Sequence, residues 1–145
     1  MVALLPDSYI KDQAQRLYFY QKMMSSRSQK QLGEVQAEIE DRYGHSPTEV
    51  HNAFTIMSIR IRARDNGMER IEVGGGRISV EFKDPAQVPP RIFTILGRKN
   101  RECYFTRATF VWPFSGDPLN AADRMMDSFE SAVKEIEDAR ASLGV

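Results

Sequence analysis

The sequence predicts an α+β fold with three N-terminal helices, a small, mainly antiparallel sheet and a long C-terminal helix. Apolar residues first recur at the three- and four-residue spacing of amphipathic helices, and then alternate with polar residues as in half-buried strands. A long helical pattern returns at the C-terminal end. The length of 145 residues is typical of one domain with its own apolar core. We therefore expect residues 1–145 to form a single domain.

The sequence marks the second helix more clearly than the first. Residues 12–24 are expected to form the first helix. The apolar residues on its expected buried side are Leu17, Tyr20 and Met24. The second helix begins at a capping-box pattern, Ser28 followed three residues later by Gln31, and ends at Gly44. Its expected buried residues are Leu32, Val35, Ile39 and Tyr43.

The third helix has a start signal and an end signal. The run Ser46-Pro47-Thr48-Glu49 combines a capping residue with a proline suited to the first helical position, and Asn66-Gly67 ends the pattern. The buried face is expected to consist of Val50, Ala53, Phe54, Met57 and Ile61.

Two strand pairs and a short helix follow. The glycine run 74–76 separates two alternating segments and predicts a hairpin. Its expected inward residues are Ile71, Val73, Ile78, Val80 and Phe82. After a proline-rich connection, residues 91–96 are expected to form a short helix that ends at Gly97. Residues 102–106 and 109–112 form the second expected pair.

The last helix begins after Asp117-Pro118, a pair suited to capping it. Its apolar residues step by four and three, which predicts a long amphipathic helix. They are Met125, Phe129, Ala132, Ile136, Ala139 and Leu143.

The composition limits the classes of function. Twenty basic and twenty acidic residues give zero net charge, so no global field attracts nucleic acid or an anionic membrane. Cys103 is the only cysteine, which excludes an internal disulfide and fits a reducing cytoplasm, where we expect a buried, unreactive thiol. The segment from Met1 to Asp7 does not resemble a signal peptide, and no apolar run is long enough to span a membrane.

The chain carries no recognisable catalytic motif. His45 and His51 flank a helix start without the spacing of metal ligands, and no phosphate-binding loop is present. The glycine run 74–76 precedes a strand where a dinucleotide fingerprint requires a helix. Nucleophile triads lack any local signature. We therefore expect no catalytic site, no cofactor and no metal in this chain.

The second helix carries an acidic face. Glu34, Glu38 and Asp41 lie opposite its apolar residues, and Arg42 lies at the edge of this face. Three acids at mutual three- and four-residue spacing repel one another unless an outside cation relieves them. Taken alone, such a stripe is usually an ordinary solvated helix face, and a protein-binding surface at these four residues is the alternative.

A basic cluster in the C-terminal half suggests a different function. Tyr104 and Phe105 lie among its cations, and such a mixture is typical of surfaces that bind single-stranded nucleic acid. Its members are Arg91, Arg98, Lys99, Arg101 and Arg107. Because both aromatics fall in an expected strand, we expect at least one of them to belong to the core.

Several segments resemble the C-terminal domain of the bacterial transcription-repair coupling factor. They are Leu5-Pro6-Asp7-Ser8-Tyr9-Ile10, then Arg16-Leu17 with Tyr20, and then Glu38, Asp41-Arg42-Tyr43-Gly44 and Pro47. The similarity is clear from about Leu4 to Phe82, and beyond it only the order of the elements matches.

The resemblance implies that the chain is the last domain, and so a fragment, of a large ATP-driven DNA translocase. That family removes stalled RNA polymerase from damaged DNA and recruits the nucleotide excision repair machinery. Its C-terminal domain packs against an N-terminal module and covers the surface by which that module recruits the excision nuclease A subunit. Glu38, Asp41 and Arg42 match the family positions of this contact, which implies an autoinhibitory role.

We accordingly expect Glu38 and Asp41 to accept hydrogen bonds from arginines of the N-terminal module, and Arg42 to donate to one of its carboxylates. The isolated domain is expected to be a monomer that binds neither membranes nor, directly, nucleic acid. Two alternatives remain: a nucleic-acid-binding accessory domain that uses the basic cluster 91–107, and a hydrolase whose site is built from scattered residues.

Overall fold

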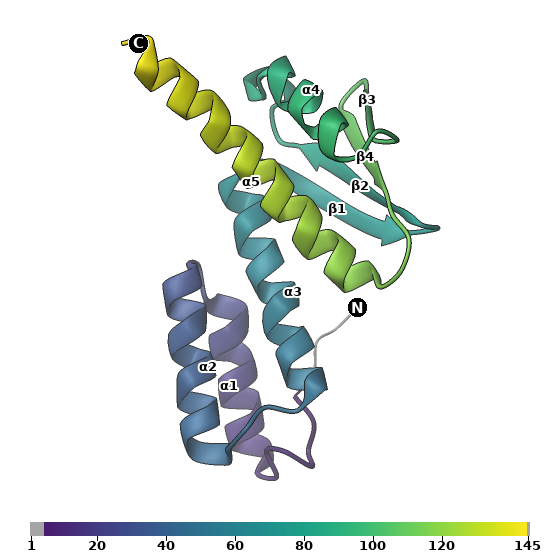
Figure 1. The fold of residues 1–145 in the computed structure, drawn as a ribbon. Coiled ribbons are helices and arrows are strands. Elements are labelled where there is room, and N and C mark those ends of the chain that lie inside the picture. Colours follow the sequence, from purple (N-terminus) through teal and green to yellow (C-terminus); the bar gives the residue numbers. More distant parts are fainter. Residues whose placement is uncertain (1–4, 145) are drawn as a thin grey trace. The chain divides into compact units, whose positions relative to one another are not determined.

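A computed structural model describes residues 5–144, so the expectations that concern Met1 and Leu4 lie outside the described residues. The chain forms two compact units, Met1–Ile61 and Arg62–Val145, and the boundary between them falls within the third helix. The elements, labelled in Figure 1, are α1 (Gln13–Ser25), α2 (Gln29–Tyr43), α3 (Thr48–Asp65), β1 (Met68–Gly74), β2 (Arg77–Phe82), a 3-10 turn (Pro85–Gln87), α4 (Pro90–Lys99), β3 (Tyr104–Thr106), β4 (Thr109–Pro113) and α5 (Pro118–Ser142). The α+β prediction is confirmed.

In the first unit, α1 and α2 form a helical hairpin that shares one apolar core with the first part of α3. Ser28 begins α2 as predicted, because its hydroxyl accepts a hydrogen bond from the Gln31 backbone amide. The buried residues include Leu5, Ile10, Phe19, Met23, Leu32, Val35, Ile39, Val50, Ala53, Phe54, Met57 and Ile61. The expected faces of the second and third helices are therefore confirmed, with Tyr43 only half-buried.

The buried side predicted for α1 was wrong for two of its three residues, whereas Tyr20 is partly buried against this core. Leu17 and Met24 are 56% and 41% exposed, and Phe19 and Met23 are buried in their place. Because apolar residues occupy nearly every position from 17 to 20 and again at 23 and 24, two adjacent helical rows fit the pattern equally well. Packing against α2 selects the row that contains Phe19.

The predicted cap of α3 also differs. The Ser46 hydroxyl is buried and donates to the Glu40 carboxylate (2.9 Å), so it does not cap the helix. The Pro47 carbonyl instead accepts from the backbone amides of Val50 and His51, and the helix begins at Thr48. The start signal predicted that the Ser46 hydroxyl would cap the backbone of α3, but this hydroxyl forms a hydrogen bond with the Glu40 side chain instead.

In the second unit, four strands form an antiparallel sheet in the order β1-β2-β4-β3. The β1–β2 hairpin turns at Gly75 and Gly76, whose φ angles of 59° and 72° suit a two-residue turn and favour glycine. Arg107, at the β3–β4 turn, also has a positive φ of 54°. Ile78, Val80 and Phe82 are buried as predicted, whereas Ile71 is half-buried and Val73 is exposed.

Both helices of this unit cover the same face of the sheet. Phe93 of α4 stacks on Phe105 (4.3 Å between ring centres) and contacts Phe110, and these two residues pair across β3 and β4. Phe129 of α5 stacks on Phe82 of β2, on the face that also carries Val80 and Phe110. Side chains that alternate with these residues point to the opposite face.

Three further expectations were wrong in this unit. The short helix α4 does not end at Gly97 but continues to Lys99. Tyr104 and Phe105 are 46% and 36% exposed, so neither belongs to the core, because β3 is a three-residue edge strand. Leu143 is 77% exposed, since the last turn of α5 extends past the residues that bury Ile136.

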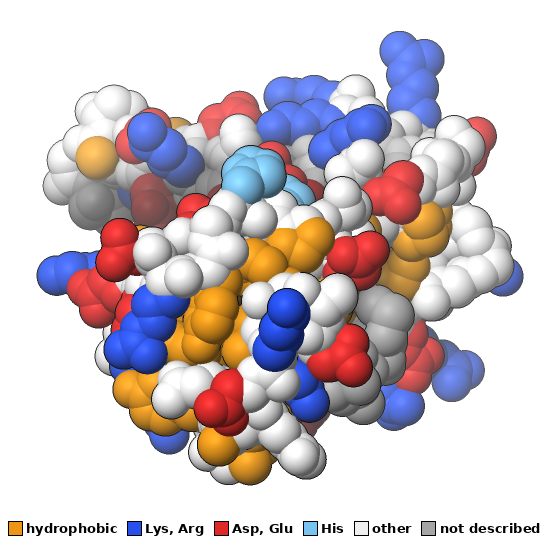
Figure 2. All heavy atoms as spheres, turned by 90° about the horizontal axis from the view of Figure 1, so that it is seen from below, with side chains coloured by type: hydrophobic (Ala, Val, Ile, Leu, Met, Phe, Trp, Pro, Cys, Tyr) orange, Lys and Arg blue, Asp and Glu red, His pale blue; other side chains and the backbone are white. Residues whose placement is uncertain are grey.

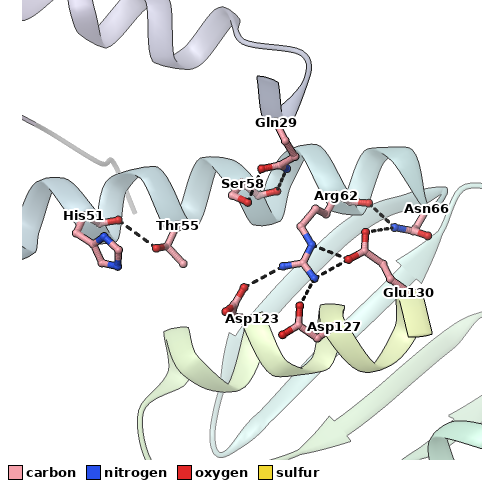
Figure 3. Close-up of polar contacts among 9 residues, drawn as sticks. All are labelled: Gln29, His51, Thr55, Ser58, Arg62, Asn66, Asp123, Asp127 and Glu130. Carbon is pink, nitrogen blue, oxygen red and sulfur yellow. Dashed lines mark hydrogen bonds and ion pairs between the residues drawn. The ribbon is translucent and has the colours of Figure 1, made fainter. Parts of the chain in front are cut away.

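Arg62 makes the densest polar network of the second unit (Figure 3). Its guanidinium is largely buried and donates to three carboxylates of α5: Asp123 (2.9 Å), Asp127, and Glu130 (2.6 and 2.8 Å). Burial disfavours its charge, but the hydrogen bonds with Glu130 and Asp127 raise the pKa of Arg62 above its ordinary value. The network joins the end of α3 to α5 within this unit.

Within residues 5–144, no helix combines the length and the apolar character needed to cross a membrane.

Candidate functional site

The segments that carry the family resemblance meet in the first unit, around the end of α2. The Tyr9 hydroxyl donates to the Gly44 carbonyl (2.6 Å), and the Tyr9 and Tyr43 rings lie 5.9 Å apart. Arg16 donates to the Ile10 carbonyl (2.9 Å), which ties the segment before α1 to that helix. Gly44 has a φ of 85°, which glycine adopts without strain at a helix end. These motif residues therefore build a support for α2.

The four predicted interaction residues occupy two sides of α2. Glu34 and Asp41, seven residues apart, are exposed on the side opposite the buried residues. Glu38 and Arg42 instead lie on the side that faces α1, where both contact its side chains. The structure thus places all four residues on one helix, where Glu38 and Arg42 already contact other side chains of the chain.

Glu38 is the centre of a small ion-pair cluster. Its carboxylate lies 3.3 Å from the Lys22 ammonium of α1 and 3.6 Å from the Arg42 guanidinium, one helical turn along α2. Arg42 also donates to the Gln15 side chain (3.4 Å) and lies 5.6 Å from the centre of the Phe19 ring. Cations from within the chain thus neutralise Glu38, whereas Glu34 and Asp41 make no ion pair within the described residues.

Sequence reasoning missed the contribution of α1. The Lys22 ammonium lies over the Tyr18 ring, 5.0 Å from its centre. Interactions with the Tyr18 side chain and with Glu38 raise the pKa of Lys22 above its ordinary value, so Lys22 is fully charged near neutral pH. The four-residue spacing of Tyr18 and Lys22 was visible, but their position beside Glu38 depends on how the two helices pack.

A hollow of about 370 Å³ opens beside the ion pair, at the end of α1. Apolar Val35 and the acidic residues Glu34 and Glu38 line it. Its other lining residues are Lys22, Ser25, Ser26 and Gln31. The hollow is open to solvent and mainly polar, so it suits a side chain from another protein surface better than an apolar ligand.

The histidines and Cys103 are residues with possible catalytic or metal chemistry. His45 and His51 are both exposed, and no group of three or more His, Cys, Asp or Glu residues within the described chain is arranged to hold a metal ion. Cys103 is half-buried, where we expected a buried thiol, and burial raises the pKa of its thiol. The hydrolase alternative stays a prediction.

The two aromatic residues of the basic cluster lie on opposite faces of the sheet. Phe105 lies on the sheet face that α4 covers, where it stacks on Phe93, whereas Tyr104 alternates to the other face. Tyr104 therefore points away from α4, the helix that carries Arg91 and Arg98. Figure 2 shows that, on the face it presents, acidic and basic side chains intermingle around exposed apolar ones. Nucleic-acid binding by this cluster stays a prediction.

Comparison with known proteins places this arrangement in a family. Residues 1–92 match the family model described as the TRCF domain. The chain belongs to the TRCF domain family. The match covers the whole of the α1–α2 hairpin, including the four predicted interaction residues.

Several transcription-repair-coupling factors are similar in sequence. That of Haemophilus influenzae is 33% identical over 115 residues, which are 79% of this chain and 10% of the relative. That of Myxococcus xanthus is 36% identical over 80 residues (55% and 7%), and that of Escherichia coli 30% over 119 residues (79% and 10%). The chain thus spans about a tenth or less of the length of these relatives.

The fold matches that of a solved domain. The crystal structure of the C-terminal domain of transcription-repair coupling factor superposes with a TM-score of 0.76, at 19% identity, over 97% of this chain and 91% of that chain. At this identity, the likeness shows the fold. It includes the second unit, most of which lies beyond the residues of the family match. The fold of this chain is therefore that of the C-terminal domain of a transcription-repair coupling factor.

Proposed function

We propose that this TRCF domain is a cytoplasmic, non-catalytic regulatory domain that docks on the N-terminal module of its own longer protein. In the docked state it masks the surface by which that module binds the excision nuclease A subunit. The domain would thereby hold back nucleotide excision repair until the transcription-repair coupling factor is engaged. The docking surface consists of Glu34, Glu38, Asp41 and Arg42 on α2.

One observation carries the proposal: some motif residues at the end of α2 hold the helix in place, and others present charged side chains at its surface. Tyr43 and Gly44 bind the segment before α1, while Glu38, Asp41 and Arg42 present charge outside the core. Charges on a helix held by such contacts are pre-positioned, so docking loses less side-chain and backbone freedom than it would on a mobile loop.

Charge chemistry gives the surface selectivity for its partner. Asp41 is exposed, and no described residue makes an ion pair with it, so it is available to accept from a partner arginine. Arg42 offers a planar guanidinium that can donate to a carboxylate while it stays over Phe19. Complementary charge at such a surface mainly determines which partner binds and in which orientation.

The test removes the domain from the full-length parent protein. Deleting residues 1–145 is expected to increase binding of the nuclease A subunit about tenfold or more. Docking that stabilises the closed state by about 1.4 kcal/mol changes the ratio of closed to open molecules tenfold. Adding this chain back as a separate protein should reverse the increase. Binding is measured by titration of labelled A subunit.

Two matched variants of the added chain separate docking from nonspecific effects. Asp41→Arg should no longer reverse the increase, because it places a cation opposite the partner's cations. Glu49→Arg changes another exposed acid, on the first turn of α3, and should still reverse it. If the parent without this domain binds the A subunit no better than the intact parent, the autoinhibitory function is wrong.

A further inference from the structure

Lys22 is the residue of α1 that forms an ion pair with Glu38 of the docking surface. Its ammonium is held between the Tyr18 ring (5.0 Å to the ring centre) and the Glu38 carboxylate (3.3 Å). The side chain also lines the hollow between the two helices, together with Glu34 and Val35. A positive charge thus already occupies the place at Glu38 that a partner cation would take.

We propose that Lys22 is an internal competitor for Glu38, and that a guanidinium of the docking partner displaces it and enters the hollow between α1 and α2. This inference rests on the proposed docking function and adds to it the residue that limits the strength of docking. The occupant is an arginine side chain on the N-terminal module of the parent protein.

The shape and charge of the hollow favour such an occupant. Glu34, Glu38 and Lys22 all line the hollow, and Glu38 also lies 3.6 Å from the Arg42 guanidinium. Glu34 makes no ion pair within residues 5–144, so it is the lining acid whose charge a partner cation can still neutralise. The aliphatic stem of an arginine can pack on Val35 while its planar head donates to two carboxylate oxygens. An ammonium lacks this forked geometry, so the guanidinium is the better partner for Glu38.

Competition has a defined cost for docking. In the free domain, Lys22 and Glu38 are about two-fifths and one-third exposed, so their ion pair is a surface pair of modest strength. Docking requires Lys22 to release or share Glu38, and its charge also repels the approaching guanidinium. Removal of that charge therefore favours the docked state by a factor of roughly two to five.

The experiment uses the full-length parent with Lys22→Met, which keeps the aliphatic stem and removes the charge. Because docking masks the nuclease site, we expect this variant to bind the nuclease A subunit ~2–5-fold more weakly than wild type. Lys22→Arg retains the positive charge and should bind the A subunit no more weakly than wild type. Raising the salt concentration to about 0.5 M should reduce the difference between Lys22→Met and wild type.

The control variant is Lys30→Met, which removes an exposed lysine from the first turn of α2. Lys30 has no ion pair within residues 5–144 and does not line the hollow. It is expected to leave A-subunit binding unchanged. Thermal unfolding of each variant checks that differences in binding do not reflect loss of folded protein.

The outcomes separate this inference from the function on which it rests. If deletion of the domain releases the A subunit but Lys22→Met binds it as wild type does, competition by Lys22 is wrong and autoinhibition stands. If Lys22→Met binds the A subunit more tightly, Lys22 contacts the partner directly, which also overturns competition. If deletion releases nothing, both proposals fail.

Discussion

Ile39 and Glu34 lie on the same helix but contribute to different properties of the chain. The Ile39 side chain is fully buried in the core of the first unit, whereas Glu34 is exposed. Ile39→Ala is expected to lower the free energy of unfolding by about 2–5 kcal/mol, since it removes buried methyl groups and leaves a cavity. Glu34→Ala should change it by less than ~0.5 kcal/mol. Urea denaturation of the two variants compares these values directly, and equal losses would contradict the orientation of α2.

Cys103 offers a test of local burial. Because burial raises the pKa of its thiol, less thiolate is present near pH 8 than in an unfolded chain, and alkylation by iodoacetamide should be slower in the folded protein. The folded state then retains the proton to higher pH. Its contribution to stability is complete below the ordinary thiol pKa, and is lost as pH rises through the raised value. A pH series of alkylation rates, native against urea-unfolded, measures the shift, and equal rates would contradict it.

Lys22 illustrates why single contacts are harder to predict than exposure. Helical spacing alone placed Glu34 and Asp41 on the solvent side of α2, because the buried row at Leu32, Val35 and Ile39 determines which side faces out. No spacing within α2 can show that a lysine sixteen residues earlier reaches Glu38. That contact depends on the packing of two helices, which the pattern of one helix does not contain.

Among the elements, α2 and the start of α5 have the helix ends that local signals predicted best. Ser28, Gly44 and Asp117 each fix a helix end through a local hydrogen bond or a backbone conformation, so neighbouring residues suffice to locate them. The apolar face of α1 was ambiguous because two rows compete. Gly97 did not end α4, since buried Ile95 and Leu96 and the Asn100 cap keep the helix intact through the glycine. Tertiary packing outweighs the modest helix cost of one glycine.

The Arg62 network predicts a strong dependence of the second unit on one side chain. Arg62→Ala leaves three carboxylates of α5 without their shared cation, and should destabilise this unit by roughly 1–3 kcal/mol, a value limited by the exposure of the carboxylates. Arg124→Ala, which removes an exposed arginine of α5, should cost less than about 0.5 kcal/mol. Chemical denaturation followed by Trp112 fluorescence compares the two. Similar losses in the free energy of unfolding for the two variants would show that the Arg62 network adds little to the stability of this unit.

Over the whole molecule, similarity of fold extends further than similarity of sequence. The family match ends at residue 92, whereas the structural likeness covers 97% of the chain. A helix or strand keeps its place when its buried residues remain apolar and of suitable size, so the pattern can persist while identities change. The prediction of three helices, a sheet and a final helix relied on such patterns. The two compact units, by contrast, follow from contacts between distant segments, which periodicity does not reveal.

The proposed docking predicts release without unfolding in the intact parent protein. Asp41→Ala combined with Arg42→Ala removes exposed charge while leaving the core residues of α2 in place. If these charges pair across an interface, their loss strands partly desolvated partners and costs the docked state roughly 2–5 kcal/mol, or less at an exposed rim. Even the lower value is more than a tenfold change in the ratio of closed to open molecules.

The double variant should therefore bind the nuclease A subunit more tightly, while the melting temperature of the isolated chain shifts little. Because surface charge pairs weaken with ionic strength, increasing salt should raise A-subunit binding by the wild type more than by the double variant. Titrations at about 0.05 M and 0.5 M salt measure both effects. A double variant that binds like wild type at low salt would show that Asp41 and Arg42 do not hold the closed state, and a parallel loss of stability would assign them a structural role instead.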